Sequence, residues 1–168
     1  MRPDADKEER FAAITREYKD VIAKVCCLYS SPTSPFDDLF QEVLINIWLG
    51  LDSFRAEAKL STWIYRAALN TCISWHRRNS KHRQSDTLRL DDIGFDLPDK
   101  SPANEKLEQY QELLKLIAQL SPIDKALITL WLDEKSYSEI GTIMGMTSGN
   151  VAVKIHRIKD KLSKMAEA

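Results

Sequence analysis

The chain of 168 residues has few of the residues that mark a turn-rich β fold or a disulfide-stabilised one: five glycines, six prolines and three cysteines. Gly and Pro form most short turns between strands, so their scarcity favours helices. Cys26 and Cys27 are adjacent and Cys72 stands alone, which leaves no CxxC pair and an odd count. The three histidines complete no ligand set at zinc spacing, so we expect no metal and no cofactor.

Three further features are missing from the sequence. No apolar run is long enough to cross a bilayer, and the first ten residues, MRPDADKEER, lack the hydrophobic core of a signal peptide. We therefore expect a cytoplasmic protein that does not insert into membranes. No nucleophile–base set, Gly-rich phosphate loop or pair of carboxylates in an apolar setting is present, so an enzyme is not indicated.

What the chain does have is charge arranged in blocks. Its formal net charge is only −1, yet residues 55–83 carry seven basic side chains and one acidic, and residues 135–168 carry six and three. The blocks 1–54 and 84–134 are acidic. Two separate basic segments predict that a polyanion is contacted at two places and not over the whole surface. For either segment alone, a solvated helix face is the alternative.

Helical periodicity accounts for most of the chain. Asp37 or Asp38 is expected to cap the second helix, and Ser121 with Pro122 marks the start of a later one. Residues 79–103 contain prolines, serines and five aspartates with little periodicity, which is typical of a linker. The expected fold is all-α, with two small helical domains at 1–80 and 104–168 joined by a flexible acidic linker at 81–103. The predicted helices cover residues 8–29, 37–51, 60–78, 104–120, 122–133, 136–144 and 147–165.

The last two predicted helices form a helix-turn-helix. Gly145 stands where the first helix needs a residue with positive φ to end, and Thr147 or Ser148 can cap the second. Four apolar residues at spacings of 4, 3 and 4 predict one buried stripe on the second helix: Val151, Ile155, Ile158 and Leu162. The outer side is basic and suits the DNA major groove. A hairpin that closes an ordinary bundle is the alternative. The outer and flanking positions are Gly149, Asn150, Val153, Lys154, His156, Arg157, Asp160, Lys161 and Lys164.

The helix at 37–51 is more apolar than one buried stripe requires. Phe40, Leu44, Ile47 and Leu51 form the predicted core stripe, and Ile45 and Leu49 fall on the opposite side. An apolar spot surrounded by acidic and amide groups is typical of a protein-binding surface. A helix buried on both sides is the alternative. The neighbours of the spot are Asp38, Gln41 and Glu42, with Trp48 at its margin.

The third helix combines aromatic and basic side chains. Bases stack on rings and phosphates pair with cations, so this combination suits single-stranded nucleic acid. The helical spacing of Trp63 and Trp75 favours the core over stacking for these two rings. Asn70, a polar residue in an apolar stretch, needs a partner inside or outside the protein. The remaining aromatic and basic side chains of the segment are Tyr65, Arg66, Arg77, Arg78, Lys81 and Arg83.

These segments together resemble one family. DDLFQEVLINIWLGLDSFR is similar to the second region of sigma-70 factors, with its D-x-x-Q-E-x-F/L-x-x-x-W/Y pattern followed by FR, and LSTWIYRAALNT is similar to its continuation. LSPIDKALITLWLDEKSYSEIGTIMGMTSGNVAVKIHRIKDKL resembles the fourth region. The intervening third region is absent, as in the extracytoplasmic-function group. The resemblance therefore implies a sigma factor that directs core RNA polymerase to promoters in a stress or extracytoplasmic response.

The resemblance also implies roles for residues and partners. The 37–51 helix would dock on the β′ clamp helices, and the second domain on the β flap. Asn70 would lie near a pocket for a flipped base of the melted minus-ten strand, and the C-terminal helix would bind minus-thirty-five duplex. An anti-sigma partner is implied as well. The candidate residues are Asp38, Gln41, Glu42, Ile45, Trp48 and Leu49 for polymerase, Trp63, Tyr65, Arg66, Asn70, Arg77 and Arg78 for the minus-ten element, and Asn150, Ala152, Val153, Lys154, His156, Arg157 and Lys161 for the minus-thirty-five element.

Some positions depart from the family pattern. Ala152 and Val153 stand where many relatives carry Arg, Lys or Ser, so hydrogen bonds to bases are lost there. Ser121 replaces Pro, Lys125 replaces Arg and Gly141 replaces Ala. These departures leave the promoter sequence open. A self-standing helix-turn-helix regulator is the alternative function, and it would bind a palindromic site without polymerase.

Overall fold

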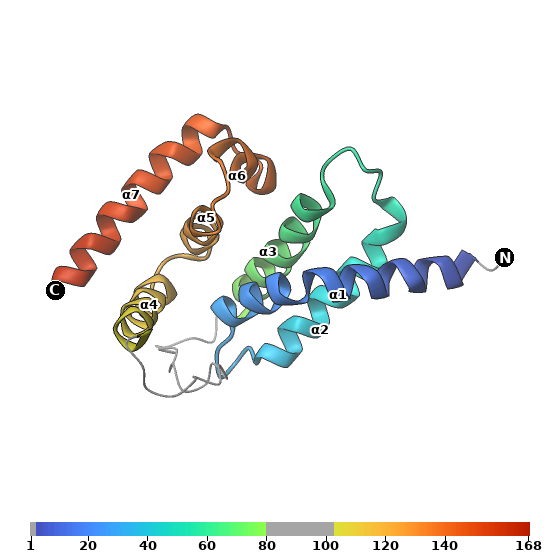
Figure 1. The fold of residues 1–168 in the computed structure, drawn as a ribbon, viewed down its shortest axis with the longest axis horizontal. Helices are drawn as coiled ribbons and strands as arrows, with labels where there is room; N and C mark the ends of the chain where they lie inside the picture. The colour runs from blue at the N-terminus through green and yellow to red at the C-terminus, as the bar shows by residue number, and fades with distance from the viewer. Residues whose placement is uncertain (1–2, 80–102) are drawn as a thin grey trace.

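The computed structural model describes residues 3–79 and 103–168, and within these ranges the chain is helical apart from short connections and one isolated bridge between Ser31 and Ser34. The first group of helices is α1 (Pro3–Tyr29), α2 (Phe36–Gly50), the short 3-10 helix η1 (Leu51–Ser53) and α3 (Leu60–Asn79). The second group is α4 (Ala103–Ala118), α5 (Pro122–Leu132), α6 (Tyr137–Met144) and α7 (Ser148–Glu167). Figure 1 shows the two groups side by side. The all-α prediction is confirmed.

The first group packs α1 and α2 against each other and both against α3. The fully buried stripe of α2 is Leu39, Val43, Ile47 and Leu51. The sequence prediction placed Phe40 and Leu44 in this stripe, but they are half-buried. The prediction was wrong by one position at its start because α2 is covered on two adjacent sides, by α1 and by α3, and not along a single line.

The predicted cap of α2 was also wrong. The N-cap position is Pro35, without a side-chain cap, so Asp37 and Asp38 lie inside the first turn. There the carboxylates interact favourably with the positive end of the helix dipole.

The second group follows its predicted caps closely. Ser121 Oγ accepts a hydrogen bond from the backbone N–H of Asp124, and Pro122 occupies the first turn of α5. The predicted stripe of α7 is buried in full, against α5 and α6: Val151, Ile155, Ile158 and Leu162. The predicted linker at 81–103 lies almost wholly outside the described residues, as do Lys81 and Arg83 of the basic segment. Among the described helices, none is long and apolar enough to cross a membrane.

The two groups also contact each other. Helices α5 and α6 pack against α3, and the apolar cores of the groups form one continuous cluster. In Figure 1, α5 and α6 lie between α7 and the first group. This arrangement brings the middle of α3, which carries many of the candidate minus-ten residues, next to the helix-turn-helix.

Candidate functional site

The helix-turn-helix is formed by α6 and α7. At its start, Ser136 Oγ accepts from Glu139 N at 3.1 Å and Glu139 Oε2 accepts from Ser136 N at 2.8 Å, which is a capping box. These hydrogen bonds lower the pKa of Glu139 from its ordinary value. Gly145 ends α6 with φ 69° and ψ 37°, the left-handed conformation predicted from the sequence. Thr147, one of the two predicted caps of α7, accepts from Asn150 N at 3.2 Å.

The turn brings the two helices very close together at Gly141. A Cβ at this position would lie 2.5 Å from the carbonyl oxygen of Met146, and Met146 N donates to Gly141 O at 2.9 Å. A side chain at position 141 would therefore require the turn to move away from α6.

The outer side of α7 is open to solvent. Val153 is 51% exposed, Ala152 is half-buried, and the other candidate residues of this helix are all exposed. They lie opposite the buried stripe, as the sequence predicted. The side chains available for contact are thus basic groups, an amide and an imidazole, with one apolar group among them: Asn150, Val153, Lys154, His156, Arg157 and Lys161.

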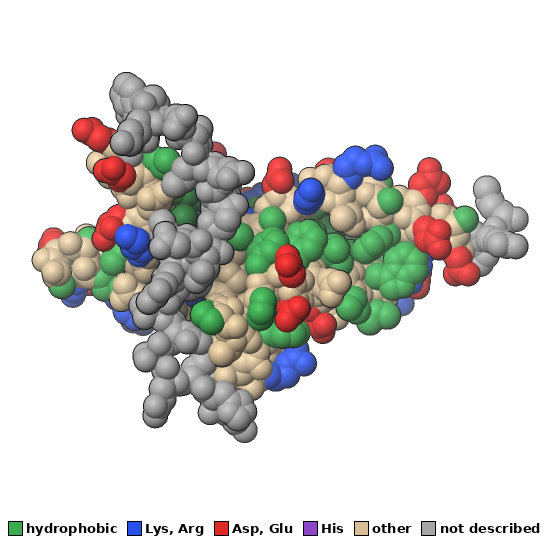
Figure 2. All heavy atoms as spheres, turned by 90° about the horizontal axis from the view of Figure 1, so that it is seen from below, with side chains coloured by type: hydrophobic (Ala, Val, Ile, Leu, Met, Phe, Trp, Pro, Cys, Tyr) green, Lys and Arg blue, Asp and Glu red, His purple; other side chains and the backbone are tan. Residues whose placement is uncertain are grey.

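The outer side of α2 is apolar as predicted. Ile45 is 50% exposed and Leu49 is 67% exposed, while Asp38 and Gln41 are exposed and Glu42 is half-buried beside them. Figure 2 shows hydrophobic side chains gathered on the face seen from below in Figure 1, with acidic side chains among them. The alternative of a helix buried on both sides does not describe α2.

Trp48 differs from its neighbours on α2. Its ring packs edge-on against Phe11, with ring centroids 5.3 Å apart, and Lys7 Nζ lies 4.5 Å from the ring. Lys7 also pairs with Asp52 at 2.5 Å. Trp48 therefore holds α1 against the end of α2 and is half-buried, while Ile45 and Leu49 remain available.

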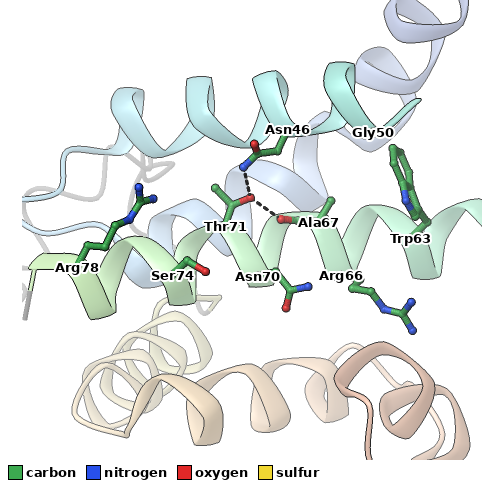
Figure 3. Close-up of a pocket in the computed structure, with 9 residues that line it drawn as sticks. All are labelled: Asn46, Gly50, Trp63, Arg66, Ala67, Asn70, Thr71, Ser74 and Arg78. Atoms are coloured by element: carbon green, nitrogen blue, oxygen red, sulfur yellow. Dashed lines mark hydrogen bonds between the residues drawn. The ribbon is translucent and has the colours of Figure 1, made fainter. Parts of the chain in front are cut away.

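A pocket of about 350 Å³ runs along α3 (Figure 3). Asn46 Nδ2 donates to Thr71 Oγ1 at 2.9 Å, and Thr71 Oγ1 donates to Ala67 O at 2.7 Å, which ties α2 to α3. Asn70 is exposed and points away from α2, so of the two options that the sequence left open, the side chain is available to a partner outside the protein. The polar and basic lining could hold an anionic or base-containing ligand. The lining residues are Asn46, Gly50, Trp63, Arg66, Ala67, Asn70, Thr71, Ser74 and Arg78.

The two tryptophans of α3 are both packed against neighbouring elements. Trp63 lies 5.2 Å from the ring of Phe54 and against Gly50, where an added Cβ would meet the indole at 3.0 Å. Trp75 Nε1 donates to the buried Ser34 Oγ at 3.0 Å. Both rings are half-buried, and Trp63 also lines the pocket.

The other candidate minus-ten residues of α3 divide into two pairs. Arg77 and Arg78 are exposed at the C-terminal end of the helix, and the guanidinium of Arg78 lies 5.7 Å from the Trp75 ring. Tyr65 is buried and Arg66 bonds to backbone carbonyls of α6. Of the candidate minus-ten residues, the pocket is lined by Trp63, Arg66, Asn70 and Arg78, whereas Tyr65 and Arg77 are not part of its lining.

Two features of α3 and its surroundings escaped the sequence analysis. Asn46 and Ser74 line the pocket, but no pattern in their own helices distinguishes them from ordinary surface residues. Asp133 accepts a hydrogen bond from Tyr65 Oη at 3.0 Å. Burial of the hydroxyl raises the pKa of Tyr65, and the nearby Asp133 carboxylate raises it further. The sequence did contain a signal for Asp133: an anion at the C-terminal end of a helix opposes the helix dipole, so such a residue needs a partner elsewhere.

Comparison with known proteins identifies both halves of the chain. Residues 14–82 match Sigma-70 region 2, and residues 110–162 match Sigma-70, region 4. The sigma factor YlaC of Bacillus subtilis is 33% identical over 134 residues, which cover 76% of this chain and 75% of that protein. The ECF sigma factor SigW of the same organism is 28% identical over 169 residues, covering 94% and 89%.

Solved structures share the fold. The sigma factor RpoE of Bartonella quintana, in complex with the anti-sigma factor NepR, superposes with a TM-score of 0.69 at 18% identity, covering 97% of this chain and 98% of that one. CnrH, in complex with the cytosolic domain of CnrY, gives 0.65 at 18% identity, covering 95% and 89%. With regions 2 and 4 in order, and relatives matched over most of their length, the chain belongs to the sigma-70 family and is an extracytoplasmic-function RNA polymerase sigma factor, a non-enzymatic protein that directs promoter recognition.

Proposed function

We propose that the exposed face of α2 is the main docking surface for core RNA polymerase, with the β′ clamp helices as its partner. The observation that supports this is the pair Ile45 and Leu49, which are at least half exposed on one side of a helix whose opposite side is fully buried. Apolar groups surrounded by polar ones are typical of the centre of a protein interface. Asp38, Gln41 and Glu42 supply the polar margin. Region 4 docks separately, on the β flap.

The α3 pocket and its surroundings bind the melted minus-ten strand in this proposal. The pocket combines the indole of Trp63 with the amide of Asn70 and the cations Arg66 and Arg78. A ring for stacking, an amide for a base edge and cations for phosphates are the groups that single-stranded DNA requires. Tyr65 and Arg77 lie on the same helix, outside the lining of the pocket.

The outer side of α7 reads the minus-thirty-five duplex in the major groove. Arg157 can donate two hydrogen bonds to guanine, and Asn150, Lys154, His156 and Lys161 can contact bases or phosphates. Val153 and Ala152 can contact thymine methyl groups. The factor acts in the cytoplasm, in a stress or extracytoplasmic response, and an anti-sigma factor holds it inactive.

Run-off transcription with purified core polymerase on genomic fragments tests this function and finds the promoter. A matched pair of variants then separates the two DNA-binding surfaces. Asn70→Ala on α3 should slow open-complex formation more than it weakens polymerase binding. Asn150→Ala on α7 should instead weaken binding to upstream duplex. Equal loss of polymerase binding and open-complex formation in the first variant would count against a role for Asn70 in the melted strand.

A further inference from the structure

Helix ends at the contact between the two groups are completed by side chains from the opposite group. None of α1, α5 and α6 has a basic residue in its own last turn. The last carbonyls of a helix lack partners within it and carry partial negative charge, so a cation is favourable there. At this contact the last carbonyls of α1 and of α6 each receive a cation from the other group, and Lys24 of α1 pairs with the carboxylate of Asp133, the C-cap residue of α5.

The first group of helices, α1 to α3, is called the N-terminal group below, and it supplies the cation for α6. Arg66 on α3 donates through Nη2 to Thr142 O and through Nε to Ile143 O at 3.4 Å, and both carbonyls lie in the last turn of α6. Figure 3 shows the Arg66 side chain turned away from α2.

The second group, α4 to α7, is correspondingly the C-terminal group, and it supplies the cation for α1. Lys125 on α5 is only 5% exposed, and its Nζ donates to Leu28 O at 3.2 Å at the end of α1. The same ammonium lies 5.1 Å from the centre of the Tyr29 ring, whose hydroxyl donates to Pro122 O at 2.6 Å. The pairing of helix ends with cations is thus reciprocal.

Asp133 lies at the centre of this contact. It is the C-cap residue of α5, where a negative charge opposes the helix dipole, so the local structure does not favour it. Its carboxylate forms an ion pair with Lys24 of α1 and accepts from Tyr65 of α3. On the Tyr65 ring itself, Lys135 Nζ lies 5.3 Å from the ring centre. Lys24 and Tyr65, the two side chains that contact the Asp133 carboxylate, both lie in the N-terminal group.

We infer that the end of α1 and the middle of α3 form an intramolecular docking surface, and that its occupant in the free factor is the chain's own α5–α6 corner. Three observations support this inference. Each group supplies a cation to a helix end of the other, the Asp133 carboxylate is paired with side chains of the opposite group, and one apolar cluster continues across the contact. The occupied state engages Tyr65 and Arg66, two residues of the proposed minus-ten surface. It leaves the outer side of α7 exposed. In the docked factor Tyr65 and Arg66 are therefore withdrawn from melted strand, while the outer side of α7 is open to upstream duplex, a consequence that rests on the proposed function.

Charge reversal at Asp133 tests the docking directly. Asp133→Lys places a cation beside Lys24 and removes the acceptor of Tyr65, so the free protein should open and its radius of gyration in small-angle scattering should rise by several ångströms. The double variant Lys24→Asp with Asp133→Lys restores an ion pair and should return the radius toward the wild-type value. Asp160→Lys, which breaks an exposed pair with Lys164 on α7, is the matched control and should leave the radius of gyration at the wild-type value.

A milder variant guards against a general loss of structure. Tyr65→Phe removes only the hydroxyl donor and should open the protein partly, with an unchanged helical circular dichroism spectrum. A radius of gyration that is the same in wild type, Asp133→Lys and Tyr65→Phe, with folded spectra in all three, would overturn the docking surface.

The consequence for DNA is measured separately, by binding of the free factor to a single-stranded minus-ten oligonucleotide and to an upstream duplex. Asp133→Lys should raise affinity for the single strand several-fold more than the Asp160→Lys control does, and should leave duplex affinity within about twofold. If Asp133→Lys opens the protein but single-strand affinity stays at the wild-type value, the docking surface stands. The assignment of Tyr65 and Arg66 to the melted strand is then what fails.

Discussion

Substitution by Ala at two glycines of the helix-turn-helix should lower stability at one position and not at the other. Gly145 ends α6 at φ 69°, and Gly149 lies in the first turn of α7. An added Cβ would meet nothing within 4 Å at either site, so steric contact with neighbours contributes nothing to the comparison. Only the backbone conformation distinguishes the two positions.

The expected magnitudes follow from that difference. A non-glycine residue in the left-handed conformation costs about 1–2 kcal/mol. The lower freedom of Ala in the unfolded chain offsets about 0.4–1 kcal/mol of this cost. Gly145→Ala should therefore lower the free energy of unfolding by about 1 kcal/mol. Gly149→Ala gains helix propensity, up to about 1 kcal/mol in a helix interior and less in the first turn, so it should be neutral or stabilising.

Urea unfolding followed by circular dichroism measures both variants, and an unchanged slope with denaturant shows that the unfolded states are comparable. Gly145→Asn is a useful third variant, because Asn tolerates the left-handed region better than Ala does and should lose less. A loss of similar size in Gly145→Ala and Gly149→Ala would refute the reasoning, since the φ angle of Gly145 would then not be what sets its cost.

Four further predictions concern the same half of the molecule. Ile155→Ala removes three fully buried carbons at about 0.8 kcal/mol each, so it should cost at least ~2.4 kcal/mol and up to ~5 kcal/mol with the cavity; in the same urea titration the exposed neighbour Lys154→Ala should change stability by less than ~0.5 kcal/mol. Ser136→Ala removes the capping box and should cost about 1 kcal/mol. Because the folded pKa of Glu139 is lowered, its contribution to stability is present above the ordinary carboxyl pKa and is lost as pH falls through the folded value. Between neutral pH and values below about 4.5, the free energy of unfolding should therefore fall by more in wild type than in a Glu139→Gln variant. Arg157→Ala should lower affinity for upstream duplex by ~1–3 kcal/mol in a titration and relax discrimination at one base pair, and unchanged discrimination would contradict a base contact.

The helix-turn-helix could be predicted from the sequence almost completely. Its caps and its stripe are local signals: Gly145 needs a positive φ, Thr147 has a side-chain acceptor, and the spacing of Val151, Ile155, Ile158 and Leu162 defines one side of a helix. Each of these depends on residues a few positions apart. These local signals were therefore sufficient to predict the caps and the buried stripe that the structure shows.

The buried side of α2 and the contact between the groups were harder to predict. The stripe of α2 depends on where α1 and α3 cover it, and the helical spacing of apolar residues alone does not distinguish Leu39 and Val43 from Phe40 and Leu44. Likewise, Tyr65 and Arg66 were predicted to face DNA from their chemistry. Their partners, Asp133 and the last carbonyls of α6, are 68 to 77 residues away in sequence, and no local pattern links them.

The two sides of α7 separate the requirements of folding from those of recognition. Four residues of the helix hold it against α5 and α6, while the residues of its outer side share few contacts with the rest of the protein. Substitutions on the exposed side of a helix usually change stability by less than about 0.5 kcal/mol. Under the proposed role of α7 at the minus-thirty-five element, single substitutions at positions such as Val153 should therefore change promoter preference without loss of the fold. A factor built in this way can acquire a new set of target genes through many neutral intermediates, and its specificity can be redesigned without re-stabilising the protein.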